Sequence, residues 1–113
     1  MPSSYVPDTG DIIWLDFDPS AGHEQAGHRL ALVLSPKRYN GKTGLLICVP
    51  LTSRIKGFPF EVEFQDGSIQ GVALADQVKS LDWRVRNAQR KGKANNEVVN
   101  RIRTKIKLLL QLT

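Results

Sequence analysis

Short apolar stretches rich in β-branched and aromatic residues alternate with Gly- and Pro-containing segments over the first three quarters of the chain. The clearest stretches are 11–17, 30–34 and 45–49, and each has a length typical of a β-strand. The stretch 30–34 is apolar throughout, which predicts a strand that is buried on both faces.

The connections between these stretches predict antiparallel pairing. Asn40-Gly41 favours a tight hairpin turn that would join strands 30–34 and 45–49. Segment 60–64 alternates apolar and acidic residues and is followed by the turn signal Asp66-Gly67. Further short strands are predicted at 71–74 and 78–83. Because no segment long enough for a crossover helix separates these strands, the pattern predicts a curled antiparallel sheet or a small barrel.

The last segment has a helical period. Asn95 or Asn96 can cap its first turn, and cations lie between its apolar positions. The fold class predicted is therefore mainly β with a C-terminal amphipathic helix, whose apolar side needs the sheet or a second subunit to cover it. The apolar positions of this helix recur at steps of three and four residues: Val98, Val99, Ile102, Ile106, Leu109 and Leu110.

Length and composition narrow the picture further. With 113 residues the chain can build one hydrophobic core, which predicts a single domain spanning 1–113. Its apolar runs are far shorter than the roughly 20 residues of a membrane helix, and the N-terminus lacks an apolar signal core. We therefore expect a soluble cytoplasmic protein without membrane contact. Cys48 lies in an apolar run and is predicted to be a buried, inert thiol.

The net charge of +5 is unevenly distributed. Residues 84–113 contain nine basic side chains and one acidic side chain, Glu97, whereas the first 83 residues contain seven basic and ten acidic ones. A concentrated basic segment favours a polyanion or an acidic protein as partner. It is equally typical of a solvated helix face that aids solubility, so charge alone leaves both interpretations open.

One connection is longer than a hairpin requires. Residues 18–28 contain two glycines, a proline, acidic residues and two histidines. Long loops on small β scaffolds often carry function, so we expect this loop to be mobile and close to the active site.

Several familiar types of site are excluded by spacing. Gly41-Lys42-Thr43 resembles the end of a phosphate-binding P-loop, but Pro36 stands where that motif needs glycine, and a turn is predicted instead. His23 and His28 share a loop with no further ligands at zinc-site spacing. No glycine-flanked serine nucleophile is present either. The sequence therefore predicts neither a metal nor another cofactor.

The remaining polar residues suit cleavage of RNA, which carries its own nucleophile in the 2′-hydroxyl group. Such a reaction needs a base for the hydroxyl proton and a cation for the negative phosphorane. Arg29 matches phosphate oxygens, and Thr52 and Ser53 offer hydroxyl groups. Glu24, and with less support His28, could accept the proton. The alternatives are a surface ion pair for Arg29, turn roles for Thr52 and Ser53, and a solvated acid at Glu24; sequence spacing does not decide between them.

In addition, the chain resembles the MazF/PemK (Kid) family of toxin endoribonucleases, and it is most similar to the MazF branch. The resemblance runs from about Tyr5 to Trp83 and fades in the basic C-terminal segment. Its matching stretches are Tyr5-Val6-Pro7-Asp8, Gly10-Asp11, 14–19, Glu24-Gln25-Ala26-Gly27-His28-Arg29, Val33-Leu34-Ser35-Pro36, 39–40, 42–44, Cys48-Val49-Pro50, 56–57, 59–62 and 71–80.

The resemblance implies an SH3-like antiparallel barrel of the CcdB/MazF/PemK type that forms a homodimer, with RNA bound in a groove at the subunit interface. It implies the toxin of a type II toxin–antitoxin system, which cuts single-stranded mRNA at short motifs without metal and leaves a cyclic phosphate and a 5′-hydroxyl. It also implies a MazE-like antitoxin with an acidic, disordered tail that covers the same groove.

The resemblance also implies residue roles. Arg29 and Thr52 correspond to the catalytic pair of the family, and Glu24 corresponds to a loop residue needed for activity. Aromatic rings are candidates for stacking on bases, although at least one tryptophan is expected in the core or at the dimer interface. The candidate RNA-binding residues are Trp14, Phe17, His28, Ser53, Lys56, Lys79 and Trp83.

The chain departs from the family pattern at Leu30, because a proline commonly follows the arginine in the family. Segment 53–55 and the tail after Trp83 differ as well, which is expected to change the preferred bases. Two rival functions remain, a CcdB-like inhibitor of gyrase without nuclease activity and an inactive RNA-binding regulator with Leu30 as its lesion. The joint presence of Arg29, Thr52 and the Glu24 loop favours the enzyme.

Overall fold

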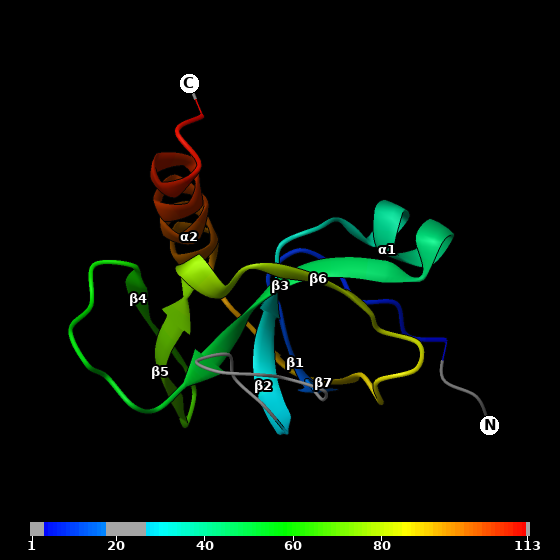
Figure 1. The fold of residues 1–113 in the computed structure, drawn as a ribbon. Helices are drawn as coiled ribbons and strands as arrows, with labels where there is room; N and C mark the ends of the chain where they lie inside the picture. Colours follow the sequence, from blue (N-terminus) through cyan, green and yellow to red (C-terminus); the bar gives the residue numbers. More distant parts are fainter. Residues whose placement is uncertain (1–3, 18–26, 113) are drawn as a thin grey trace.

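An antiparallel sheet that curls around the core is the main feature of the computed structural model, which describes residues 4–17 and 27–112 (Figure 1). The predicted fold class, mainly β with a C-terminal helix, is confirmed. The described strands are β1 (Asp11–Asp16), β2 (His28–Val33), β3 (Leu45–Thr52), β4 (Glu61–Asp66), β5 (Ile69–Leu74), β6 (Lys79–Asp82) and β7 (Gln89–Lys93). The helices are α1 (Lys37–Thr43), the short 3₁₀ helix η1 (Ala75–Gln77) and α2 (Asn96–Leu109).

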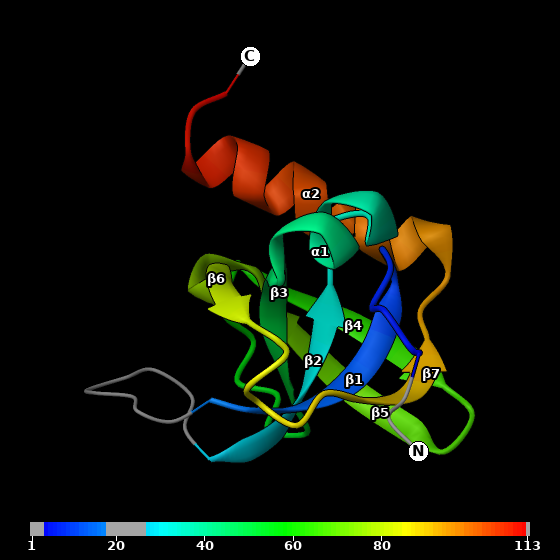
Figure 2. The same cartoon turned by 90° about the vertical axis from the view of Figure 1, so that its right-hand side faces the viewer.

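Strand β3 connects the parts of the sheet, whose order is β4-β5-β3-β2-β1-β7. Its first half pairs with β6, its last residues Leu51 and Thr52 pair with β5, and its other edge pairs with β2. Because one strand exchanges neighbours along its length, the sheet curls, and the end of β3 lies between β2 and β5 (Figure 2).

The central strands are buried on both faces, as the apolar run 30–34 predicts. Ile12 and Leu32 belong to the cluster that β4, β5 and α2 cover, whereas Ile13, Ala31 and Val33 belong to a second cluster on the opposite face. All five side chains are completely buried, which explains why these strands show no polar alternation. Cys48 lies in the second cluster, where burial raises the pKa of its thiol to about 12.

The first half of α2 anchors the helix to the sheet. Val98, Val99 and Ile102 are buried, and the side chain of Asn95 accepts a hydrogen bond from the backbone N–H of Val98 at 3.0 Å. The predicted helix and its cap are therefore confirmed. Leu109 and Leu110 remain exposed at the far end of the helix, which projects beyond the sheet (Figure 1). The helix therefore extends further than the apolar surface that covers it.

The prediction of a tight hairpin turn at Asn40-Gly41 is wrong, because helix α1 occupies this connection. The Asn-Gly turn would require positive φ angles, but the positive φ of 77° belongs to Gly44, which ends α1. Pro36 precedes the first turn of α1, as is typical of a helix start. Strands β2 and β3 nevertheless pair antiparallel as expected.

The other predicted strands are confirmed as β4, β5 and β6, and Gly67 with a φ of 59° forms the turn between β4 and β5. The sequence pattern does not predict β7, because Gln89–Lys93 contains no apolar side chain to alternate with its polar ones. Within 4–17 and 27–112, none of the helices has the length and apolar character that crossing a membrane would require.

Asn40 joins three separate parts of the chain although it lies on a helix. Its side-chain amide donates hydrogen bonds to the carbonyl groups of Pro7 (2.8 Å) and Ser35 (3.0 Å), and its Oδ1 accepts one from the hydroxyl of Ser35 (2.6 Å). Its backbone carbonyl accepts a hydrogen bond from the indole of Trp83 at 2.9 Å. The side chain is completely buried, so these bonds satisfy it in place of water.

Replacing Asn40 by Ala should lower the free energy of unfolding by roughly 2–4 kcal/mol, because the carbonyl of Pro7 and the hydroxyl of Ser35 lose their buried partner. Denaturant unfolding monitored by tryptophan fluorescence measures this loss. Asn100→Ala on the exposed side of α2 is the matched control and should change stability by less than about 0.5 kcal/mol. Equal stability of the two variants would contradict the structural role of Asn40.

Candidate functional site

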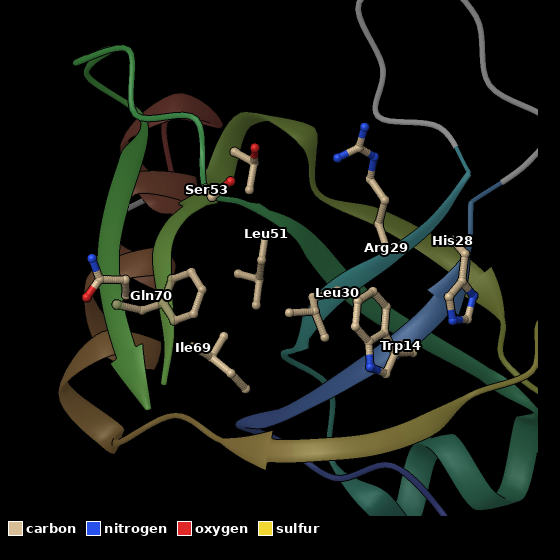
Figure 3. Close-up of a pocket in the computed structure, with 10 residues that line it drawn as sticks. Trp14, His28, Arg29, Leu30, Leu51, Ser53, Ile69 and Gln70 are labelled. Carbon is tan, nitrogen blue, oxygen red and sulfur yellow. The ribbon is translucent and has the colours of Figure 1, made fainter. Parts of the chain in front are cut away.

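A depression of about 220 Å³ lies where the ends of β1, β2 and β3 meet the hairpin formed by β4 and β5 (Figure 3). Its floor is apolar and its rim is polar, a combination typical of small binding sites. The residues that line it are Trp14, His28, Arg29, Leu30, Leu51, Thr52, Ser53, Phe64, Ile69 and Gln70.

Arg29 and Thr52 reach this depression from neighbouring strands. The register between β2 and β3 pairs Ala31 with Pro50, and Arg29 and Thr52 each lie two residues beyond this pair, near the start of β2 and at the end of β3. Thr52 is half-buried where β3 turns from β2 toward β5, whereas Arg29 is exposed. The sequence-predicted catalytic arginine and threonine therefore lie at one site.

The hydroxyl groups next to Arg29 come from the end of β3. The hydroxyl oxygen of Thr52 accepts a hydrogen bond from the backbone N–H of Arg54 at 3.1 Å, which fixes the side chain at the start of the following loop. Ser53 is exposed beside it, and Figure 3 shows its side chain on the same side of the depression as the guanidinium of Arg29. A phosphate group placed here would meet a cation and two hydroxyl groups.

Trp14 and His28 form the opposite end of the depression. Their rings stack with a centroid distance of 5.0 Å and an interplanar angle of 7°. The Nδ1 atom of His28 lies 2.7 Å from a carboxylate oxygen of Asp16, which is its direct partner in the pairing of β1 with β2. The imidazole ring is therefore held at its face by an indole and at its edge by a carboxylate.

Asp16 is held in turn by residues that precede β7. Its second carboxylate oxygen accepts a hydrogen bond from the side chain of Asn87 at 2.8 Å, and its backbone exchanges hydrogen bonds with Arg86. The hydrogen bond with His28, and then that with Asn87, lowers the pKa of the Asp16 carboxyl group below its ordinary value. Asp16 is therefore ionised at neutral pH.

Four predicted RNA-binding residues do not line the depression: Phe17, Lys56, Lys79 and Trp83. The ring of Phe17 is 2% exposed within the second core cluster, so it presents no face to a base, and the ammonium group of Lys79 lies 5.3 Å from its centre. Trp83 packs against the same cluster, as expected for at least one tryptophan, and its N–H is bonded to Asn40. Stacking on RNA bases is thus not supported for Phe17.

Lys56 lines a neighbouring cavity of about 490 Å³, together with Arg54 and Phe58. Thr52 borders both this cavity and the depression, so the two lie next to each other at the end of β3. Glu24 and the loop that contains it lie outside the described residues, and the predictions for them stay predictions.

Sequence reasoning missed Asp16, Asn87 and the side chains of β4 and β5 at this site. The signal for Asp16 was available, since an acidic residue in strand 11–17 and a histidine beside strand 30–34 become partners if these strands pair. No such signal exists for Asn87, which lies 71 residues from Asp16 along the chain.

The chain is similar to proteins of known family over almost its whole length. A family model described as "PemK-like, MazF-like toxin of type II toxin-antitoxin system" matches residues 8–110. The chain belongs to the PemK/MazF family. The endoribonuclease toxin MazF of Escherichia coli strain K12 is 56% identical over 97% of this chain and 99% of its own. The endoribonuclease toxin ChpB of the same strain is 41% identical over 80% and 82%, respectively. The family and the enzyme class predicted from the sequence are therefore confirmed.

Solved structures of the PemK/MazF family share this fold. A crystal structure of MazF from Deinococcus radiodurans has a TM-score of 0.92 and 51% sequence identity, and the match covers 96% of this chain and 100% of that one. A MazE-MazF structure from the same organism has a TM-score of 0.85 and 45% identity over 97% and 100% of the two chains. The half-barrel with its C-terminal helix is thus the architecture of the family.

Gly71 of β5 provides a test of how closely the site depends on its supporting strand. A Cβ atom at this position would lie 2.2 Å from the carbonyl oxygen of Thr52, so only glycine lets β5 approach the end of β3. Gly71→Ala should destabilise the fold by roughly 1–3 kcal/mol. Because Thr52 must shift to relieve the contact, RNA cleavage should fall on the order of 100-fold at a temperature where the variant is folded.

Gly41→Ala is the matched control, since its Cβ would meet the side chain of Val6 at 3.4 Å, an ordinary contact on a helix. It should retain cleavage and gain up to about 1 kcal/mol of stability. Thermal unfolding and initial cleavage rates measure both effects. Normal cleavage by folded Gly71→Ala would show that the site does not depend on this approach.

Proposed function

We propose that this protein is a toxin that cuts single-stranded mRNA at short sequence motifs without a bound metal ion. The observation that carries the proposal is that Arg29 of β2 and Thr52 of β3 line one depression. A guanidinium group and a hydroxyl group that line one site can bind the same phosphate and stabilise the charge that develops on it.

The proposed reaction uses the 2′-hydroxyl of the RNA itself. The 2′-oxygen attacks the adjacent phosphorus while its proton passes to a base. The bond from phosphorus to the 5′-oxygen breaks, and the 5′-oxygen takes a proton from a solvent water molecule, whose hydroxide then removes the proton from the base. The products are a 2′,3′-cyclic phosphate and a 5′-hydroxyl. Arg29 stabilises the phosphorane, Thr52 and Ser53 orient its oxygens, and Glu24 acts from the loop before β2. Electrostatic stabilisation of this kind supplies the largest part of many rate enhancements.

Incubation of the purified protein with a long single-stranded RNA in the presence of a chelator tests this reaction. Discrete fragments that end in a cyclic phosphate and begin with a 5′-hydroxyl are expected. Intact RNA with retarded migration would support an RNA-binding regulator instead. Intact RNA without binding, together with trapped gyrase–DNA complexes, would support the CcdB-like inhibitor.

Arg29→Ala and Thr52→Val should each lower the cleavage rate by about 10²- to 10³-fold, because each removes a donor to the developing charge. Their circular dichroism spectra and melting temperatures should match those of the unmodified protein. Arg38→Ala on the exposed side of α1 removes an arginine outside the site and should cut normally. Full activity of Arg29→Ala would refute the assigned mechanism.

We further propose that residues 1–113 act as one domain in a cytoplasmic homodimer that a MazE-like antitoxin with an acidic, disordered tail inhibits. An exposed apolar surface supports the dimer, because the exposed side chains of Tyr39 and Ile47 lie beside Leu34. Helix α2 borders this surface, since Arg103 donates a hydrogen bond to the carbonyl of Leu34 at 3.4 Å. The solved MazE-MazF structures of Deinococcus radiodurans support the antitoxin.

Light scattering coupled to size-exclusion chromatography should give twice the mass of the chain. Ile47→Lys, which places a charge in the apolar surface, should shift the protein to monomers, whereas Ile55→Lys in the exposed loop before β4 is the control. An acidic antitoxin tail should bind with an affinity that falls as salt rises. A monomer at micromolar concentration, or binding that salt does not affect, would contradict these assignments.

A further inference from the structure

The free end of the β4–β5 hairpin forms one wall of the depression but extends beyond its pairing with β3. Strand β5 pairs with the last two residues of β3 through Val72 and Ala73. The part of the hairpin that precedes these pairs gives the depression three of its lining side chains: Phe64, Ile69 and Gln70. A two-stranded hairpin is only marginally stable by itself. The end of this hairpin therefore needs support from another part of the fold if its wall is to be rigid.

A carboxylate connects the end of the hairpin to β7. Asp66, the last residue of β4, accepts a hydrogen bond from the backbone N–H of Lys93 in β7 at 3.1 Å. Strands β4 and β7 are the outermost strands of the sheet, and within the described chain their ladders join them to β5 and β1, not to each other. The hydrogen bond therefore links the two ends of the curled sheet, and Figure 2 shows the turn after β4 beside β7.

Gly92 of β7 makes this close approach possible. A Cβ atom at this position would overlap with the carboxylate of Asp66 and would lie 3.8 Å from Cδ1 of Ile69. Glycine inside a strand often marks a place where another group comes close. Ile69 pairs with Asp66 in the hairpin and also lines the depression, where Figure 3 shows it on the hairpin side. The contact with β7 therefore reaches the wall of the depression through one pair of residues.

The hairpin is thus held at two points, and each of them requires a glycine. Toward β3, Gly71 passes close to the carbonyl group of Thr52, and at the free end Asp66 passes close to Gly92. The first contact adjoins a proposed catalytic residue, whereas the second adjoins Ile69. A change at the second point should therefore move the wall without displacing the arginine and the threonine of the site.

We propose that Asp66 is a positioning residue that fixes the β4–β5 hairpin against β7 and thereby sets the width of the depression for an RNA strand. The inference rests on the proposed nuclease function and adds a residue that does not touch the substrate. A wall that is already in place loses less freedom when RNA binds, which favours binding. If the wall is in place for only part of the time, the apparent affinity falls by that fraction. The effect is therefore on KM, whereas kcat depends on Arg29 and Thr52.

The first test compares two replacements of Asp66. Asp66→Ala removes the acceptor and should raise KM on the order of tenfold, with kcat within about threefold of normal. Asp66→Asn keeps a side-chain oxygen that can accept the same hydrogen bond, so its KM should stay within about threefold of normal. Loss of negative charge alone would strengthen RNA binding in both variants alike. Equal KM values for the two folded variants would overturn the proposal.

Asp82→Ala is the matched control for this comparison. The carboxylate of Asp82 also accepts a backbone hydrogen bond, from the N–H of Arg84 at 3.0 Å, but this residue does not line the depression. Its replacement should leave KM unchanged. Circular dichroism at the assay temperature establishes that each variant is folded, and all variants are measured on one RNA that the unmodified protein cuts.

The second test approaches the same contact from β7. In Gly92→Ala the added Cβ atom displaces the carboxylate, so KM should rise as it does in Asp66→Ala. In the double variant Asp66→Ala/Gly92→Ala the small side chain at position 66 leaves room for this atom. The KM of the double variant should therefore lie within about twofold of that of Asp66→Ala. Multiplication of the two effects would show that the residues act separately and would overturn the proposal.

Hydrogen exchange of the Lys93 amide separates this inference from the proposed function. Its protection should fall about tenfold or more in Asp66→Ala and persist in Asp66→Asn, because only the first variant lacks the acceptor. Unchanged protection in Asp66→Ala would overturn the inference whether or not the protein cuts RNA. Failure of the unmodified protein to cut any RNA would refute the proposed function itself, whereas a normal KM for folded Asp66→Ala would refute this inference alone.

Discussion

The antiparallel pairing of β2 with β3 is the constraint on which the rest of the structure depends. It holds together two central strands that are buried on both faces, and it brings Arg29 near the start of β2 and Thr52 at the end of β3 to the same depression. A shift by one residue would reverse the faces of all the side chains in β2 and expose its apolar set. The core and the site therefore require the same register, so the stability of the core also positions the cation beside the hydroxyl.

The exchange of neighbours along β3 gives the site its shape. Where β3 stops pairing with β2 and pairs with β5 instead, side chains from these strands surround a depression. Gly71 permits the close approach of β5 that this corner needs. Strand ends offer polar side chains to solvent while the strands hold them rigidly, which suits a site that must bind a charged backbone precisely.

The basic side chains of the C-terminal segment lie away from the depression. Arg90 and Lys93 of β7 lie within 3.7 Å of the buried carboxylate of Asp11, and other cations follow the exposed side of α2. Among the described residues that line the depression, none comes from 84–113. Part of the positive charge therefore compensates a buried acid near the N-terminal segment, and the remainder forms a separate surface on the helix.

The sequence by itself determined the fold class, the faces of the buried strands, the C-terminal helix and the family, because apolar periodicity and ordered motifs are local properties of the chain. It identified Arg29 and Thr52 from chemistry and resemblance. The local pattern predicted a turn where α1 forms, because the contacts of Asn40 are made with Pro7, Ser35 and Trp83, which the Asn-Gly pair by itself does not reveal. It missed β7, whose pairing with β1 is not encoded in apolar alternation.

Only the tertiary structure decided which polar residues meet. The contact of Asp16 with Asn87 spans most of the chain, and the burial of Phe17 depends on strands that lie on both sides of it. A local pattern shows which faces of an element are apolar, but it does not show which distant element covers them. That choice follows from strand pairing and packing, whose energies depend on groups brought together from all parts of the sequence.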